Sequence, residues 1–427
     1  MKKLLYFLIT VGIVLIVGWF ILDNQLNNGS KKADSSVWTT FIGRDTTVGI
    51  LPDQYANYFT YTVARTRKNV GFRIKGRFPK SRYFSFNVYS LRDNTTQGSL
   101  IDYQIKSDSG LPNPFVAHAD STETDDHYTI HVVPDHFKSD NLENTLAFDN
   151  DTRLLSIVIR LYDYDVDDFG GRELPAVEAF SLEEDNQEEV AFVTERLPRP
   201  LNLRSIVRRR SLPKMVERLS VLYETEEIEL LDRSTSDGDF LPIPFHAIDT
   251  RGFIENNDNR YLLAGITKQD AEVYLFKLKP PTHTTGPENI NETEVRYWSF
   301  NLGNAASYNF NALKDEDAII ADDGYVYIIL ADEDDQHIKD IARERKFNFL
   351  AWNMPWKEAL ILFRHMLADP SFDAQIDNVP PIKSGSDNFS EIQAHHYMGD
   401  YAPSGERMNR TQFIIVYADD EFWEVSK

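Results

Sequence analysis

The chain has 427 residues, a formal net charge of −22 at pH 7 and no cysteine. The lack of cysteine excludes disulfides, thiolate nucleophiles and cysteine-ligated zinc or iron–sulfur sites. The acidic balance argues against nucleic acid or anionic lipid as a partner of the folded part, and the length predicts two domains rather than one core.

The N-terminal segment, residues 1–22, is predicted to be a transmembrane anchor. Residues 4–22 are apolar and carry no charge, and at about 1.5 Å per residue they match a bilayer core of roughly 30 Å. Lys2 and Lys3 precede this run and Asp23 follows it, so the N-terminus is expected to stay cytoplasmic. We therefore expect a single-pass protein of the bacterial inner membrane whose bulk is periplasmic or extracellular. The alternative is a cleaved signal peptide, but its apolar region would be about 7–15 residues long and end at a small-residue cleavage site, which this segment lacks.

After a linker, residues 23–40, the first folded domain is predicted over residues 41–195. Short segments rich in aromatic and β-branched residues, such as 82–90 and 154–162, alternate with clusters of Gly, Pro, Asn and Asp. This spacing, without regular helix alternation, is typical of antiparallel sandwiches or jelly rolls.

Residues 196–240 form a predicted connector of a different character. The segment begins basic and proline-punctuated, and residues 214–231 then place apolar side chains at helical spacing. The run Arg208 to Arg210 favours a solvated linker over a contact with anions or lipid headgroups.

The second domain, residues 241–427, is expected to repeat the first. Four blocks recur in the same order: residues 61–64 match 261–264, 82–87 match 296–301, 125–135 match 322–332, and 144–162 match 348–366. Four ordered matches at nearly constant offset indicate an internal duplication. The predicted fold is mainly β, with two tandem related antiparallel β-sandwich (jelly-roll-like) domains after one N-terminal transmembrane helix.

The chain resembles an uncharacterised bacterial family of membrane-anchored proteins with tandem β-sandwich domains of unknown function. The motifs that carry the resemblance are RYFSFNVYS at 82–90, NPF at 113–115, GGRELP at 170–175, NRYL at 259–262 and MGDYAP at 398–403. It spans most of residues 61–403. The resemblance implies a fold and a cellular class, and it implies no catalytic residues.

Two clusters could hold a metal ion. Asp163, Asp165 and Asp167 are spaced like the first ligands of a calcium loop, but the glycine and glutamate of an EF-hand are absent, so either an irregular Ca²⁺ site or a solvated acidic turn is expected. His127 and His131 would share one face of a strand, with no obvious third ligand, so a polar sheet face is the favoured interpretation.

Several polar residues occur in both copies. The pairs are Arg82 and Arg296, Asn87 and Asn301, Asn144 and Asn348, and Arg160 and Arg364. Because buried Arg and Asn need partners, we expect them to bind backbone groups at the corners of the sheets.

A cleft between the domains is the predicted ligand site. Arg296, Tyr297, Trp298 and Trp352 would line it, and aromatic faces beside carboxylates would suit sugars or other neutral polar ligands.

Three functions remain open from the sequence. The first is a membrane-tethered envelope protein that binds a ligand or partner, such as an envelope glycan or protein. The second is a carboxylate-dependent enzyme acting on envelope glycan or lipid, which would need paired carboxylates about 5–10 Å apart in an interdomain pocket. The third is a structural scaffold, favoured by a large exposed apolar patch. No cofactor is expected apart from the Ca²⁺ ion considered above.

Overall fold

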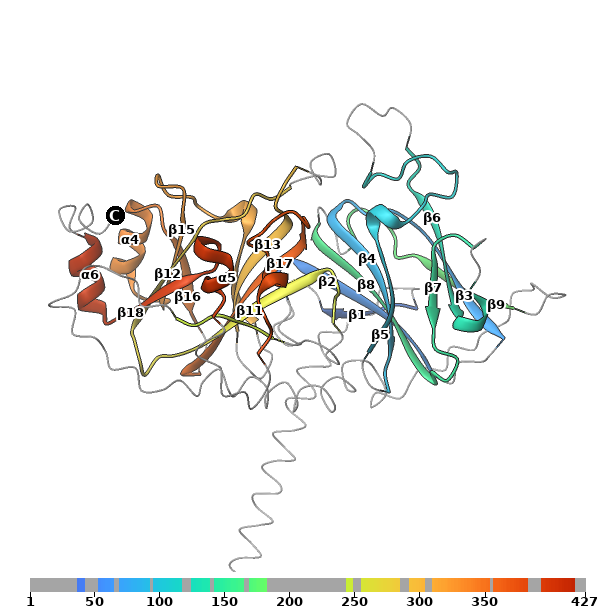
Figure 1. The fold of residues 1–427 in the computed structure, drawn as a ribbon, viewed down its shortest axis with the longest axis horizontal. Coiled ribbons are helices and arrows are strands. Elements are labelled where there is room, and N and C mark those ends of the chain that lie inside the picture. The colour runs from blue at the N-terminus through green and yellow to red at the C-terminus, as the bar shows by residue number, and fades with distance from the viewer. Residues whose placement is uncertain are drawn as a thin grey trace, which may run out of the picture.

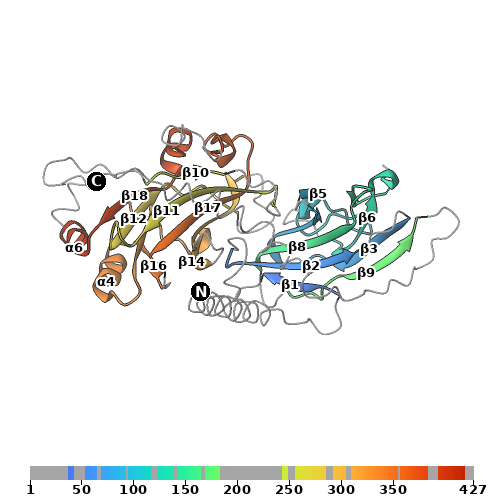
Figure 2. The ribbon, with the colours of Figure 1, turned by 90° about the horizontal axis from the view of Figure 1, so that it is seen from below.

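The computed structural model is mainly β, with four sheets divided between two halves of the chain. It describes residues 37–42, 53–64, 69–92, 95–116, 124–138, 142–164, 169–182, 243–248, 255–284, 292–303, 309–353, 356–382 and 393–418. The two halves lie side by side along the longest axis, the first coloured blue to green and the second yellow to red (Figures 1 and 2).

The first half contains two sheets around one core. The five-stranded sheet has the order β1 (Thr39–Ile42), β2 (Ala56–Ala64), β8 (Leu154–Tyr164), β4 (Ser81–Ser90) and β5 (Thr95–Ile101). The four-stranded sheet has the order β7 (Thr145–Phe148), β6 (His127–Pro134), β3 (Val70–Arg77) and β9 (Ala176–Ser181). Two 3₁₀ turns, η1 (Asp102–Gln104) and η2 (Asp135–Phe137), follow β5 and β6. Apolar side chains alternate along the strands, so each sheet sends one row, including Phe86 and Ile130, into the shared core.

The second half has the same arrangement. Its five-stranded sheet has the order β10 (His246–Ala247), β11 (Asn259–Thr267), β17 (Glu358–Ala368), β13 (Val295–Gly303) and β14 (Asn309–Lys314). Its four-stranded sheet has the order β16 (Asn348–Trp352), β15 (Val326–Asp332), β12 (Val273–Leu278) and β18 (Ser404–Met408). The helical elements are η6 (Asp315–Asp317), α4 (Gln336–Glu344), η7 (Ile376–Asn378), α5 (His395–Met398), η8 (Gly399–Tyr401) and α6 (Arg410–Ala418). Helices α4 and α6 cover the outer face of the four-stranded sheet at the end remote from the first half (Figure 1).

The internal duplication predicted from the sequence is confirmed strand by strand, but two of the four alignments were wrong in register. Tyr58 pairs with Arg160 across β2 and β8, and Tyr261 pairs with Arg364 across β11 and β17. The counterpart of Tyr261 is therefore Tyr58, three residues before the predicted Tyr61. Tyr61 instead packs in the core of the first half.

The second correction concerns β6 and β15. The backbone carbonyls of Thr129 and Tyr327 accept hydrogen bonds from the equivalent side chains of Asn144 and Asn348, so Thr129 and Tyr327 are themselves equivalent. The sequence offset between β6 and β15 is therefore one residue larger than predicted. Since neighbouring residues on a strand point to opposite faces, this shift changes the face. His127 and His131 consequently lie on the outer face, and helices α4 and α6 cover the corresponding face in the second half.

The prediction of purely antiparallel sheets was wrong for one pair of strands in each half. Strand β6 runs parallel to β7, and β15 runs parallel to β16, so both four-stranded sheets are mixed. In the second half α4 forms the crossover that a parallel pair requires.

The predicted anchor at residues 4–22, most of the 23–40 linker and the 196–240 connector lie outside the described residues. Within the described ranges, no helix combines the length and apolarity needed to span a bilayer.

Candidate functional site

Two reciprocal ion pairs join the halves. Arg82 of β4 donates to Asp315 of η6 at 2.6 Å, and Arg296 of β13 donates to both carboxylate oxygens of Asp102 of η1 at 2.8 and 2.7 Å. Arg82 and Arg296 are equivalent in the duplication, as are Asp102 and Asp315. The contact therefore has the two-way form of a twofold homodimer interface, in which each partner uses the same surface.

Each of these aspartates is also held by its own half. Asp102 accepts the backbone N–H of Phe84, and Asp315 accepts that of Trp298, both at 2.9 Å. Burial raises the pKa of Asp315, although the guanidinium of Arg82 opposes the shift. The expectation that Arg82 and Arg296 bind backbone groups was wrong, because their guanidinium groups reach carboxylates of the other half.

The expectation is confirmed for Asn144 and Asn348, whereas the Asn87 and Asn301 amides donate to the side-chain hydroxyls of Ser85 and Ser299. The Asn144 amide donates to the carbonyls of Lys106 and Thr129, and the Asn348 amide donates to those of Ile319 and Tyr327.

A second pair of interface contacts departs from the twofold pattern. Arg364 forms a salt bridge with buried Asp53, whose carboxylate also accepts the hydroxyls of Tyr297 at 3.0 Å and Ser299 at 2.7 Å. The position equivalent to Asp53 is Asn256, a neutral residue, which hydrogen-bonds Tyr83.

Beside Tyr83 and Asn256 the carboxylate comes instead from Asp258, which accepts a hydrogen bond from the Tyr83 hydroxyl. Burial raises the pKa of Asp258, whereas the hydrogen bond from Tyr83 and the nearby Arg160 oppose the rise.

The structure does not bring the four predicted ligand-binding residues into one cleft. Arg296 and Tyr297 face the other half, whereas Trp298 and Trp352 lie in the core of the second half with exposures of 0% and 3%. Trp298 follows Tyr297 on β13 and must point to the opposite face. Trp352 stacks on Tyr274 inside the sheets.

Of the three predicted calcium ligands, only Asp163 lies within the described residues. Its carboxylate contacts Arg82 at 2.9 Å and Lys314 at 2.5 Å, so cationic side chains already neutralise it. Asp165 and Asp167 lie outside the described ranges, and the calcium site stays a prediction.

The structure does not bring His127 and His131 together into one group of candidate metal ligands. His127 approaches Asp125 and Asp126, but Arg77 and Arg172 contact the Asp126 carboxylate at 2.5 and 3.0 Å. His131 lies apart from this group, and its ring contacts the backbone carbonyl of Glu143.

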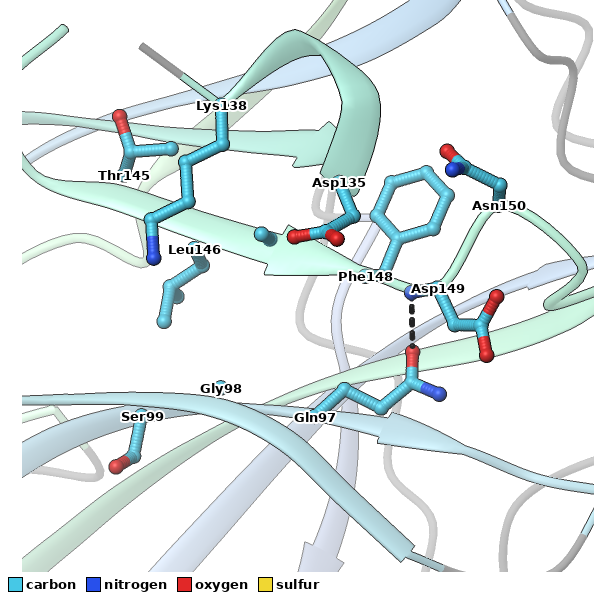
Figure 3. Close-up of a pocket in the computed structure, with 11 residues that line it drawn as sticks. Gln97, Gly98, Ser99, Asp135, Lys138, Thr145, Leu146, Phe148, Asp149 and Asn150 are labelled. Carbon is cyan, nitrogen blue, oxygen red and sulfur yellow. Dashed lines mark hydrogen bonds between the residues drawn. The ribbon is translucent and has the colours of Figure 1, made fainter. Parts of the chain in front are cut away.

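A groove of about 560 Å³ opens in the first half where the edge strands β5 and β7 meet (Figure 3). It lies within the range of roughly 300–1,000 Å³ typical of small-molecule sites. Its polar lining is contributed by Gln97, Ser99, Asp135, Lys138, Thr145, Asp149 and Asn150, and the remainder by Gly98, Leu146, Ala147 and Phe148.

A β-bulge positions the first of these side chains. In the β4–β5 ladder Val88 faces Gly98 and Tyr89 faces Thr96, so Gln97 is the extra residue. The Gln97 amide oxygen accepts the backbone N–H of Asp149 at 3.1 Å, which fixes the side chain across the groove (Figure 3).

Gly98 packs closely against β7 at the floor of the groove. A Cβ atom at this position would lie 3.2 Å from a methyl group of Leu146 and 3.4 Å from the carbonyl oxygen of Ala147. These distances are short for a Cβ atom, so a side chain at position 98 would require Leu146 to shift.

The equivalent space in the second half is occupied. The β13–β14 ladder has a bulge at the same place, with Phe310 as the extra residue and Asn311 in the position of Gly98. The Asn311 amide reaches the carbonyl of Ala351 at 3.4 Å, and Phe310 packs 5.4 Å from Trp356 between ring centres. Among the described residues, the side chains where the two edge strands meet thus differ between the halves, although the backbone is shared.

A second groove, of about 460 Å³, lies in the second half beside Phe372 and Tyr401. Its carboxylates serve local structure, since Glu294 accepts the Tyr401 hydroxyl and the Thr282 N–H at 2.8 and 2.7 Å.

Sequence reasoning did not identify the groove. Continued without a gap, the alignment of the blocks at 82–87 and 296–301 pairs Gly98 with Ala312. Only the strand pairing, in which Val88 faces Gly98 and Leu302 faces Asn311, shows that Gly98 and Asn311 are equivalent.

No family model matches the chain, and no curated protein matches it. Among solved structures it is similar to an uncharacterized protein from Burkholderia cenocepacia, with a TM-score of 0.47 and 11% identity over 78% of each chain. It is also similar to the VPA0106 protein from Vibrio parahaemolyticus, with a TM-score of 0.39 and 10% identity over 84% of this chain and 90% of that chain. At these TM-scores and identities, the similarities carry no argument about family or activity.

Proposed function

We propose that the protein is a membrane-tethered binding protein of the bacterial cell envelope. In this proposal residues 4–22 span the inner membrane and hold two jelly-roll-like sandwich domains on the periplasmic or extracellular side. The groove between β5 and β7 is the ligand site. The supporting observation is that this groove is open in one half and filled in the other.

The comparison between the halves separates function from folding. Both halves retain the same strand order and the same bulge, so the backbone of the groove serves the fold in each. A structural role would be equally served by the filled version, in which Asn311 and Phe310 close the space. An open, polar and partly charged version therefore favours a role outside folding.

The enzyme alternative receives no support from the interface. It needs two carboxylates that face one pocket between the halves, whereas Asp102, Asp315 and Asp53 are buried and face arginines. An enzyme acting on envelope glycan or lipid would also have to bind its substrate, so turnover is an outcome of the same experiment. The scaffold alternative receives no specific support, because the exposed large apolar side chains, such as Ile320 and Trp356, lie on different elements.

The test is a ligand screen on the full chain in detergent micelles, with the unfolding midpoint as the measurement. A ligand that binds only the folded state raises this midpoint, because at one hundred times its dissociation constant it adds about 2.7 kcal/mol to the free energy of unfolding. We expect stabilisation by polar envelope components and none by DNA or RNA. Stabilisation that persists when the groove is filled by substitution would overturn the proposal.

A further inference from the structure

We infer that the groove between β5 and β7 binds the hydroxyl groups of an uncharged oligosaccharide. This inference rests on the proposed function and adds the chemical class of the ligand. It is carried by the charges that line the groove, the hydrogen-bonding groups near them, and the contrast between Gly98 and Asn311.

Charged side chains of both signs line the groove. Lys138 and Asp135 belong to the turn at η2, and Asp149 follows β7. Within the described part of the chain, no hydrogen bond or ion pair engages the Lys138 ammonium or the Asp135 carboxylate. Figure 3 shows both groups directed toward the space between η2 and β5. An anionic ligand would meet two carboxylates in a chain of net charge −22, so the lining disfavours anions. The ammonium of Lys138 offsets one of the two carboxylates, which reduces the attraction for a cation.

The hydrogen-bonding groups of the lining suit hydroxyl groups. Ammonium groups only donate and carboxylates only accept, whereas a hydroxyl group does both. A sugar hydroxyl can therefore accept from Lys138 and donate to Asp135 at the same time. Ser99 adds a further hydroxyl to the lining.

The floor of the groove is formed by the Gly98 and Ala147 backbone and the Leu146 side chain. Such a surface accepts the flat C–H face of a sugar ring while the hydroxyls at its edge reach the charged groups. In the second half, Asn311 occupies this space and donates to Ala351.

The decisive variant copies the second half into the first. Gly98→Asn should place an amide beside the Ala147 carbonyl, as Asn311 is placed beside Ala351, and should fill the groove without removing a lining side chain. Position 98 has no left-handed φ, and the Leu146 methyl group, which would lie 3.2 Å from the new Cβ, has to move to admit asparagine. The matched control is Asn311→Gly, which makes the reciprocal change in the second half.

The binding experiment uses the full chain in micelles and isothermal titration with maltotriose, cellotriose and the trimer of N-acetylglucosamine. Glycylglycine, inorganic phosphate and spermidine represent zwitterionic, anionic and cationic ligands. We expect at least one trisaccharide to bind at least tenfold more tightly than any charged probe. Gly98→Asn should weaken that binding at least tenfold, and Asn311→Gly should leave it unchanged.

Two exposed substitutions keep the inference testable if Gly98→Asn does not fold. Lys138→Met and Asp135→Asn should each weaken trisaccharide binding at least fivefold while leaving the circular dichroism spectrum unchanged. If only a charged probe binds, and Gly98→Asn weakens that binding, the assignment of an oligosaccharide is overturned while the ligand site is retained. Binding that none of these groove variants alters, or an absence of binding by every probe, would overturn both.

Discussion

Removing one arginine from the interface should destabilise both halves together. In Arg296→Met the Asp102 carboxylate, whose side chain is 0% exposed, would lose its only described cationic partner. Breaking a buried ion pair from one side typically costs about 3–5 kcal/mol, because the remaining charge is left uncompensated. Asp102 would keep the backbone N–H groups of Phe84 at 2.9 Å and Tyr103 at 2.7 Å, so we expect a loss near the lower end, about 3 kcal/mol.

The assay is urea unfolding of the full chain in micelles at neutral pH, followed by tryptophan fluorescence and circular dichroism. The control is Lys106→Met, which removes an ion pair whose side chains are 65% and 60% exposed and should cost at most about 1 kcal/mol. In Arg296→Met/Asp102→Asn both charges are absent, so the loss should be smaller than the sum of the two single losses. If Arg296→Met costs no more than Lys106→Met, the interface does not stabilise the fold in the way we describe.

Three further results are expected. Burial lowers the pKa of His365 to about 3, so its neutral form stabilises the fold above the unfolded pKa of about 6.5, and this stabilisation is lost as the pH falls from 6.5 toward 3. At pH 5 the loss is about 2 kcal/mol, and His365→Leu should abolish this loss when the free energies of unfolding at pH 7.5 and pH 5 are compared. Asn348→Ala should cost about 3 kcal/mol in urea unfolding, because it removes three hydrogen bonds, two to Ile319 and one to Tyr327, each worth about 1 kcal/mol. EDTA should leave the unfolding midpoint unchanged because cations already neutralise Asp163, and a lower midpoint would instead support the calcium site.

The choice of leucine at position 365 follows from the duplication. Leu161 occupies the equivalent place in the first half, opposite Phe84, whereas His365 lies opposite Trp298. Neither ring nitrogen of His365 has a hydrogen-bond partner within the described residues. An unchanged pH dependence in His365→Leu would show that another group controls acid stability.

The strands and the duplication could be predicted because they leave local patterns. Alternating apolar residues mark each strand, and the block at 82–87 recurs almost unchanged at 296–301. The role of Asn144 and Asn348 was also predictable, since a buried amide needs backbone partners wherever it lies.

The interface could not be predicted, because its contacts join residues that are remote in the sequence. Arg82 and Asp315 are 233 positions apart, and no local signal distinguishes a carboxylate partner from a backbone carbonyl. The register of β2 was missed for a related reason. Tyr58 and Tyr61 lie on the same strand, and only the pairing with Arg160 identifies which tyrosine matches Tyr261.

The reciprocal contact of Arg82 and Arg296 also bears on how the two halves could diverge. In a homodimer of identical subunits every substitution occurs twice, so a glycine that opens a groove opens it in both copies. Here one polypeptide encodes both halves, and covalent linkage keeps their effective concentration high without a requirement for identical sequences. One copy can therefore keep Asn311 and a closed edge that favours stability, while the other carries Gly98 and is free to change with the ligand.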